Sequence, residues 1–148
     1  MKRVGLLKML LLLVGCAEMA YGRVLFVGAN QASPGDGTQS RPYNQAQQAI
    51  EASAQGDTIH FLPGIYNYSV TVSNKSDLVL EGSVDPDGND VTFIQIEGVG
   101  SDIGISLVNS SNVVVQNFLI MGAQYGLRMI GGENNRIEGV HCRGCSSR

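Results

Sequence analysis

The chain has 148 residues, enough for one domain, and its 19 glycines, lack of tryptophan and 16% charged residues are typical of a turn-rich globular protein. From Arg23 onward it carries 7 basic and 12 acidic residues, a net charge of −5. Because an acidic domain repels a phosphate backbone, the charge argues against nucleic acid as a partner, and an acidic glycan would need a local basic patch or a bridging cation.

Residues 1–22 are predicted to be an export signal outside the folded domain. A basic start precedes a six-residue apolar run, which is too short to span a bilayer as a helix. Residues 13–16 resemble a bacterial lipobox, which would place a lipid on Cys16, whereas the small residues Ala20 and Gly22 would permit ordinary cleavage after Gly22. We therefore expect a protein that is secreted, periplasmic or anchored in the cell envelope, with membrane contact only through a lipid on Cys16.

Residues 23–57 are predicted to form a strand, a polar loop and a short helix. Ala46, Ala49 and Ile50 fall on one helical face, and Gly56 is expected to end the helix in a left-handed conformation. The open end of a strand stack would expose core residues and unpaired strand edges, so the helix is assigned to cover that end.

The remaining residues, 58–148, are dominated by a repeat. Residues 104–125 and 126–147 match at a 22-residue offset. Identical or similarly apolar residues align at Gly104/Gly126, Asn112/Asn134, Gly122/Gly144, Ile105/Leu127, Leu107/Met129, Val108/Ile130, Val115/Ile137 and Phe118/Val140. Short apolar runs that recur at this period, separated by turn residues, indicate a solenoid in which each repeat is one coil.

An earlier coil lies 35 residues upstream, since residues 76–82 resemble residues 111–117. The surplus over one coil is assigned to residues 83–90, because SVDPDGND is turn chemistry rather than strand chemistry. The sequence therefore predicts an all-β fold of parallel coils. Asn112 and Asn134 are placed at equivalent corners, where Asn tolerates left-handed bends and can hydrogen-bond up the stack.

Several motifs resemble the amino-terminal cap and first coils of right-handed parallel β-helix proteins, the pectate-lyase-like superfamily. They are Gly37-Thr38, Arg41-Pro42-Tyr43, Ala49-Ile50, Ala52, Gly56-Asp57-Thr58-Ile59, Pro63-Gly64-Ile65-Tyr66, and residues 111–118 and 126–139. The resemblance runs from about Arg23 onward. It implies a right-handed parallel β-helix solenoid of about 22 residues per coil with a short amino-terminal capping helix. It implies little about activity, because one fold carries many functions.

Members of this superfamily include polysaccharide lyases, polygalacturonase-type hydrolases, pectin esterases, epimerases and non-catalytic surface proteins. The resemblance implies that this sequence is the amino-terminal part, truncated at its carboxyl end, of a carbohydrate-active protein that acts on or binds extracellular polysaccharide. In the lyases of this group, calcium neutralises the uronate and an Arg or Lys abstracts a proton, several coils into the helix. This chain alone is therefore expected to be inactive, and the alternative is a non-catalytic envelope or surface protein used for glycan binding or as a scaffold.

Asp85, Asp87 and Asp90 are the candidate metal ligands, because clustered carboxylate and amide oxygens suit Ca²⁺. Ile96 stands where an EF-hand would place its bidentate Glu, and the same residues also fit a plain hydrophilic turn. Arg128 is the candidate substrate contact, because a guanidinium binds carboxylates in a bidentate way. An exposed, solubilising arginine fits the same position.

Cys142 and Cys145 form a Cys-x-x-Cys pair, which in an exported protein can oxidise to a disulfide or simply fill a coil corner. A zinc site would need two further ligands, and only His141 is nearby. His60 is expected to point outward from its strand. Neither histidine accompanies a recognisable Ser or Cys nucleophile motif, so no catalytic residue is assigned.

Overall fold

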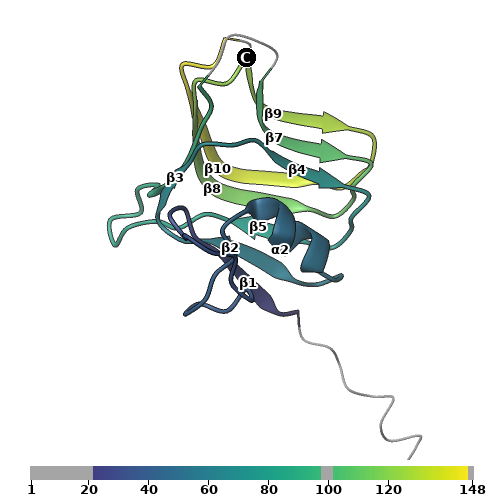
Figure 1. The fold of residues 1–148 in the computed structure, drawn as a ribbon. Helices are drawn as coiled ribbons and strands as arrows, with labels where there is room; N and C mark the ends of the chain where they lie inside the picture. The colour runs from purple at the N-terminus through teal and green to yellow at the C-terminus, as the bar shows by residue number, and fades with distance from the viewer. Residues whose placement is uncertain (1–21, 98–101, 147–148) are drawn as a thin grey trace, which may run out of the picture.

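The computed structural model describes residues 22–97 and 102–146 (Figure 1). The strands and the one helix of this part of the chain are β1 (Val24–Val27), α2 (Ala46–Ala52), β2 (Thr58–Phe61), β3 (Gly64–Tyr66), β4 (Val70–Ser73), β5 (Val79–Glu81), β6 (Thr92–Gln95), β7 (Ile103–Val108), β8 (Val114–Met121), β9 (Tyr125–Ile130) and β10 (Arg136–Arg143).

The strands pair in parallel throughout, and the chain returns to each stack after one circuit. One stack runs β1, β2, β5, β8, a second runs β3, β6, β8, and a third runs β4, β7, β9. Strand β8 belongs to two stacks because it bends at Asn117, whose φ is 62°, and β10 pairs along β8. Figure 1 shows the curved, stacked layers. The fold is therefore mostly β, with parallel sheets compatible with the all-β solenoid that the sequence predicts.

The 22-residue register is confirmed pair by pair. Strand β7 aligns Ile105 with Leu127 and Leu107 with Met129 on β9. Strand β8 likewise places Val115 beside Ile137 of β10. Period-2 alternation explains why these positions line the core, since side chains on a strand point alternately to opposite faces. The apolar repeat of the sequence is thus the inward face of successive circuits.

The surplus residues of the second circuit lie where the sequence places them. Glu81 pairs with Gln116, 35 positions later, whereas Phe93 pairs with Leu119, only 26 positions later. The chain between β5 and β6 leaves the sheet as a small hairpin, in which Val84 and Asp90 form an antiparallel bridge. This 83–90 hairpin projects beside the outer face of β6.

Left-handed corner residues stack from circuit to circuit. Asp77, Asn112 and Asn134 have φ values of 55°, 54° and 58°. Asn112 Nδ2 donates a 3.1 Å hydrogen bond to Asp77 Oδ1. Toward the next circuit the side-chain contact comes from Asn135 instead of Asn134, because Asn135 Oδ1 accepts the N–H of Val113 at 3.0 Å. The predicted corner is correct, and the neighbouring asparagine makes the bond up the stack.

Helix α2 covers the amino-terminal end of the core, packing against β1 and β4. Its buried residues are the predicted Ala46, Ala49 and Ile50. The helix ends at Ala52 with an extended Ser53, so Gly56 is not its cap; Gly56 has φ +87° in the turn that follows. The helix is shorter than predicted because the Ser53 side chain turns back to donate to the Ile50 carbonyl at 2.7 Å.

The last described circuit exposes its inward face. Met129 is 50% exposed and Ile137 is 36% exposed, whereas their equivalents Leu107 and Val115 are fully buried. Within the described residues no further strand lies over β9 and β10, which accounts for the difference.

Candidate functional site

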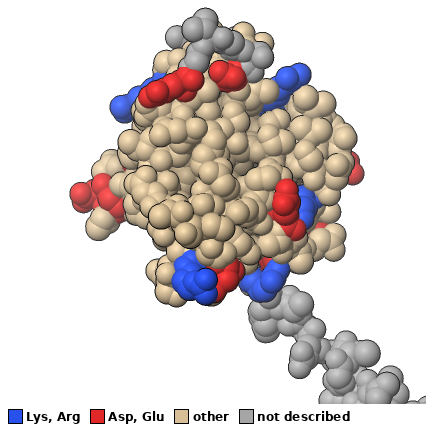
Figure 2. Space-filling view, viewed as in Figure 1, with Lys and Arg blue, Asp and Glu red and all other residues tan. Residues whose placement is uncertain are grey.

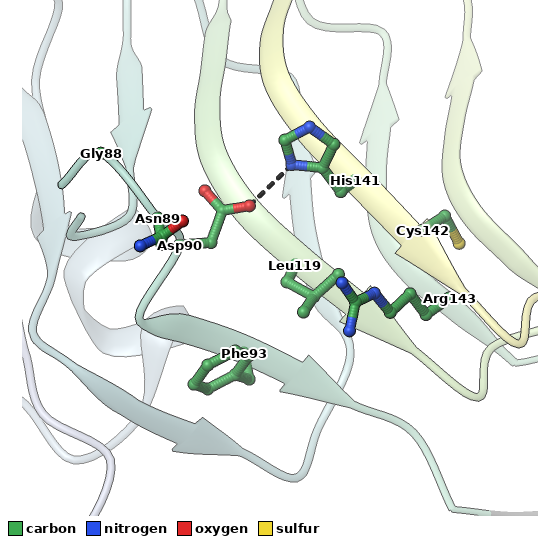
Figure 3. A pocket seen from close by; sticks show the side chains of 8 residues that line it. All are labelled: Gly88, Asn89, Asp90, Phe93, Leu119, His141, Cys142 and Arg143. Atoms are coloured by element: carbon green, nitrogen blue, oxygen red, sulfur yellow. Dashed lines mark hydrogen bonds and ion pairs between the residues drawn. The ribbon is translucent and has the colours of Figure 1, made fainter. Parts of the chain in front are cut away.

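A cleft of about 530 Å³ lies between the 83–90 hairpin and the outer face of the second strand stack (Figure 3). The hairpin contributes Gly88, Asn89 and Asp90, and the strands contribute Phe93, Leu119, His141, Cys142 and Arg143. We call this the hairpin cleft. It lies where the surplus residues of one circuit stand beside the regular strands of the next two.

Strand register builds the floor of the hairpin cleft. Phe93 pairs with Leu119, and Leu119 pairs with His141, so these three side chains form a row across β6, β8 and β10. Neighbouring strands are about 4.8 Å apart, which sets the spacing of the row. Because Ile94 and Ile120 on the same strands point into the core and are fully buried, the row faces outward.

Asp90 holds the imidazole of His141. Oδ2 of Asp90 accepts a 2.7 Å hydrogen bond from Nδ1 of His141. The Asp90 side chain is only 12% exposed, whereas that of His141 is 67% exposed. A carboxylate on Nδ1 fixes the tautomer that carries the proton there, which leaves Nε2 as the free nitrogen. In Figure 3 the second ring nitrogen of His141 points away from Asp90.

Arg143 adds a cation to the same wall. It lies two residues beyond His141 on β10, and its side chain extends toward Leu119 in Figure 3. Among the described residues it forms no salt bridge. A guanidinium beside an apolar floor suits a ligand that carries a carboxylate on a partly apolar ring. The hairpin cleft thus combines an aromatic ring, an oriented imidazole and a guanidinium.

The three candidate calcium ligands do not converge. Asp85 Oδ1 accepts the backbone N–H groups of Asp87 and Asn89 at 3.0 and 2.8 Å, and hydrogen bonds from the Asn89 side chain and backbone lower the pKa of Asp85. Asp90 faces His141 instead. In residues 22–97 and 102–146 no group of three His, Cys, Asp or Glu side chains is placed to hold a metal ion. Asp85 therefore serves the hairpin as a turn-stabilising acceptor.

Arg128 lies on β9, paired in register with Ser106 as the repeat predicts. It is exposed on the third strand stack and does not line the hairpin cleft. Glu138 on β10 forms a salt bridge with Arg136 at 3.1 Å, and Asp102 directly precedes β7. Among the described residues, Arg128 forms no salt bridge with either carboxylate.

A second polar cluster joins His60, Glu81 and Ser83, a grouping that sequence reasoning missed. His60 Nδ1 lies 3.0 Å from Glu81 Oε2, and His60 Nε2 lies 3.1 Å from Ser83 Oγ. The order of groups matches that of a serine nucleophile with its base. However, Ser83 is buried, its hydroxyl donates to the Phe61 carbonyl at 2.8 Å and its N–H donates to Thr92 Oγ1. With neither group free for a substrate, the cluster is structural.

Cys142 and Cys145 form a disulfide at the end of β10. It packs against the backbone of Gly126 on β9, where any side chain would collide with the Cys142 sulfur. Cys16, the lipidation candidate, lies outside the described residues. No helix in the described part of the chain is long and apolar enough to cross a membrane.

Sequence reasoning missed the hairpin cleft because Asp90 and His141 are 51 residues apart. The one available signal was the repeat itself, since the 22-residue offset from Leu119 leads to His141. On the face shown in Figure 2, most of the surface is uncharged, and acidic and basic side chains lie around the rim in small mixed groups. The lining of the hairpin cleft itself holds one carboxylate, Asp90, and one guanidinium, Arg143.

Comparison with known protein families, curated proteins and solved structures gives no match for this chain.

Proposed function

We propose that this chain is the amino-terminal part of an exported, right-handed parallel β-helix protein of the pectate-lyase-like type, which binds or acts on extracellular polysaccharide. The proposal rests on the motif resemblance and on the parallel circuits. The single observation that carries the polysaccharide part of the proposal is the hairpin cleft, where Phe93, the Asp90–His141 pair and Arg143 lie together.

Each group of the hairpin cleft has a use with an acidic sugar. Phe93 offers a ring against which a pyranose can pack, and Arg143 can bind a carboxylate with two parallel hydrogen bonds. Asp90 holds Nδ1 of His141 and the side chain is largely exposed, so its Nε2 can accept a hydrogen bond from a sugar hydroxyl. In a lyase the same nitrogen would accept the proton that lies α to the uronate carboxylate.

The alternative is a glycan-binding or scaffold protein without catalysis. It is favoured by the dispersed carboxylates, since among the described residues none are grouped to hold the calcium that a lyase of this kind uses. The groups of the hairpin cleft would then bind the polysaccharide and leave it unchanged.

The decisive experiment titrates the protein with acidic and neutral oligosaccharides, for example oligogalacturonate and a neutral glucan, and follows ultraviolet absorbance for the double bond that a lyase creates. Binding of the acidic glycan that is weakened in Arg143→Gln and Phe93→Ala, but not in Arg128→Gln, would support the hairpin cleft. New absorbance would select the lyase over the binding protein. Equal binding of Arg143→Gln and wild type would overturn the assignment.

Export is tested separately by intact mass of the protein recovered from outside the cytoplasm. A mature chain that begins at Arg23 would support ordinary cleavage. A diacylglycerol adduct on Cys16 would instead support the lipid anchor. Retention of residues 1–22 would contradict both ordinary cleavage and lipidation.

A further inference from the structure

We propose that His60 is a positioning residue for the hairpin cleft. Through Ser83 it holds the base of the 83–90 hairpin, and the hairpin in turn presents the Asp90 carboxylate to His141. The consequence for a glycan rests on the proposed function, but the positioning itself is a property of the free protein.

The base of the hairpin is tied down on both sides. The Val91 N–H donates to the Ser83 carbonyl at 3.0 Å, and the Ser83 N–H donates to Thr92 Oγ1 at 2.8 Å. The Ser83 hydroxyl reaches back to the previous circuit, where it donates to the Phe61 carbonyl at 2.8 Å. Ser83 is therefore the point at which the hairpin is fastened to β2 and β6.

His60 is itself held in one orientation, with Nε2 against Ser83. Its Nδ1 lies 3.0 Å from Glu81 Oε2, and the second oxygen of Glu81 accepts a 2.9 Å hydrogen bond from Gln116. The Phe26 ring packs edge-on at 5.6 Å. Contacts to both ring nitrogens and to the ring itself leave the imidazole little rotational freedom.

The hairpin is cross-linked internally, so a shift at Ser83 is passed on to Asp90 on the opposite arm. Val84 and Asp90 form an antiparallel bridge, and the Asp85 N–H donates to the Asn89 carbonyl at 2.9 Å. Asp85 Oδ1 also accepts the Asn89 N–H at 2.8 Å. Coupling can be carried by a chain of packed and hydrogen-bonded groups, and the contacts from His60 through Ser83 to Asp90 form such a chain.

Two substitutions of His60 separate its contacts. An asparagine amide stands as many bonds from Cα as Nδ1 does, and a glutamine amide as many as Nε2. His60→Asn thus keeps a partner for Glu81 and loses Ser83, whereas His60→Gln keeps a partner for Ser83 and loses Glu81. Both variants remove the imidazole ring and keep a side-chain amide, so they control for each other.

The readout is the ¹⁵N NMR signature of the His141 ring, measured without glycan. Wild type should show the tautomer protonated at Nδ1, and Asp90→Asn should show its loss. We expect His60→Asn and Ser83→Ala to lose most of that signature, His60→Gln to retain it, and the double variant His60→Asn/Ser83→Ala to match the singles. Ser83→Ala keeps the His60–Glu81 pair, so it carries the test if His60→Asn fails to fold.

An unchanged His141 signature in folded His60→Asn and Ser83→Ala would overturn the proposal. Equal loss in His60→Asn and His60→Gln would also overturn it, because general loosening would then explain both. If the signature responds as expected while no glycan binds to wild type, the positioning stands and the proposed function fails.

Discussion

Asp90 and His141 lie 51 residues apart in the sequence, yet Oδ2 of Asp90 accepts a 2.7 Å hydrogen bond from Nδ1 of His141. Asp90 belongs to the 83–90 hairpin, and His141 lies on β10, one 22-residue circuit after β8. The contact ties an irregular insertion to a regular strand. It forms one wall of the hairpin cleft.

The pair should matter more for binding than for stability. A polar contact with one largely exposed partner contributes up to about 1 kcal/mol to folding, and the His141 side chain is 67% exposed. Asp90→Asn should therefore leave the melting temperature nearly unchanged while weakening acidic-glycan binding about tenfold, as expected for loss of a charge-assisted hydrogen bond. Calorimetric titration measures the second effect. Asp87→Asn is the matched control, and an equal loss of binding there would contradict the assignment.

The loss of stability on truncating equivalent inward-facing side chains should depend on how deeply each side chain is buried. Leu80, Val115 and Ile137 stand in one row across β5, β8 and β10, but Leu80 is fully buried and Ile137 is 36% exposed. Leu80→Ala should lower the free energy of unfolding by about 3 kcal/mol, and Ile137→Ala by about 1 kcal/mol or less. Urea denaturation measures both. Equal losses would show that the last circuit is covered in solution.

The left-handed corner at Asn112 should reject a β-branched side chain. With φ at 54°, Asn112→Val should cost about 1–2 kcal/mol in backbone strain and a further ~1 kcal/mol from the lost bond to Asp77. Asn112→Gly loses only the hydrogen bond, because glycine adopts this φ freely. Chemical denaturation of the two variants should therefore rank valine below glycine; the reverse order would refute the strained corner.

The link between Asp57 and Arg23 should make stability sensitive to acid. Burial alone would raise the pKa of Asp57, but hydrogen bonds from the Ala54 N–H and from the Arg23 side chain and backbone, together with the Arg23 charge, hold it below 3.8. Because the folded pKa is the lower one, the unfolded chain binds more protons in this range. The stabilisation is thus present above about pH 4 and is lost as pH falls through the folded pKa.

Urea titrations between about pH 3 and 6 test this linkage, since the unfolded carboxyl titrates in that range. Asp57→Asn should be less stable than wild type at neutral pH and should lose less on acidification. Arg23→Gln keeps the Ala54 contact and should fall between the two. If the stability of Asp57→Asn fell with acidification as steeply as that of wild type, the acid sensitivity would come from other groups.

The disulfide should make a modest, local contribution. Cys142 and Cys145 close a loop of only a few residues, for which the chain-entropy argument gives about 2 kcal/mol. Reduction or Cys145→Ser should therefore lower the melting temperature by a few degrees and leave the core cooperative. Differential scanning calorimetry with and without reductant measures the shift. Loss of the transition on reduction would mean that the pair supports the whole fold.

The sequence by itself determined the circuits of this protein. Ile105/Leu127 and Val115/Ile137 repeat because each circuit must present an apolar side chain to the same core, and the corner residues Asp77, Asn112 and Asn134 repeat because the bend needs a left-handed residue. Such requirements recur at a fixed period, so they can be recognised in the sequence alone. The helix is visible for the same reason, although its end is not, because Ser53 turned back onto Ile50.

Only the tertiary structure decided the hairpin cleft and the His60 cluster. The extra residues 83–90 interrupt the 22-residue period, so the sequence shows where the hairpin leaves the sheet. It does not show which strand the hairpin contacts. Asp85, Asp87 and Asp90 look like one acidic group along the chain, yet the turn uses Asp85 internally and turns Asp90 toward His141. Side chains that meet across circuits are set by register and by loop packing together, and only the first of these is periodic.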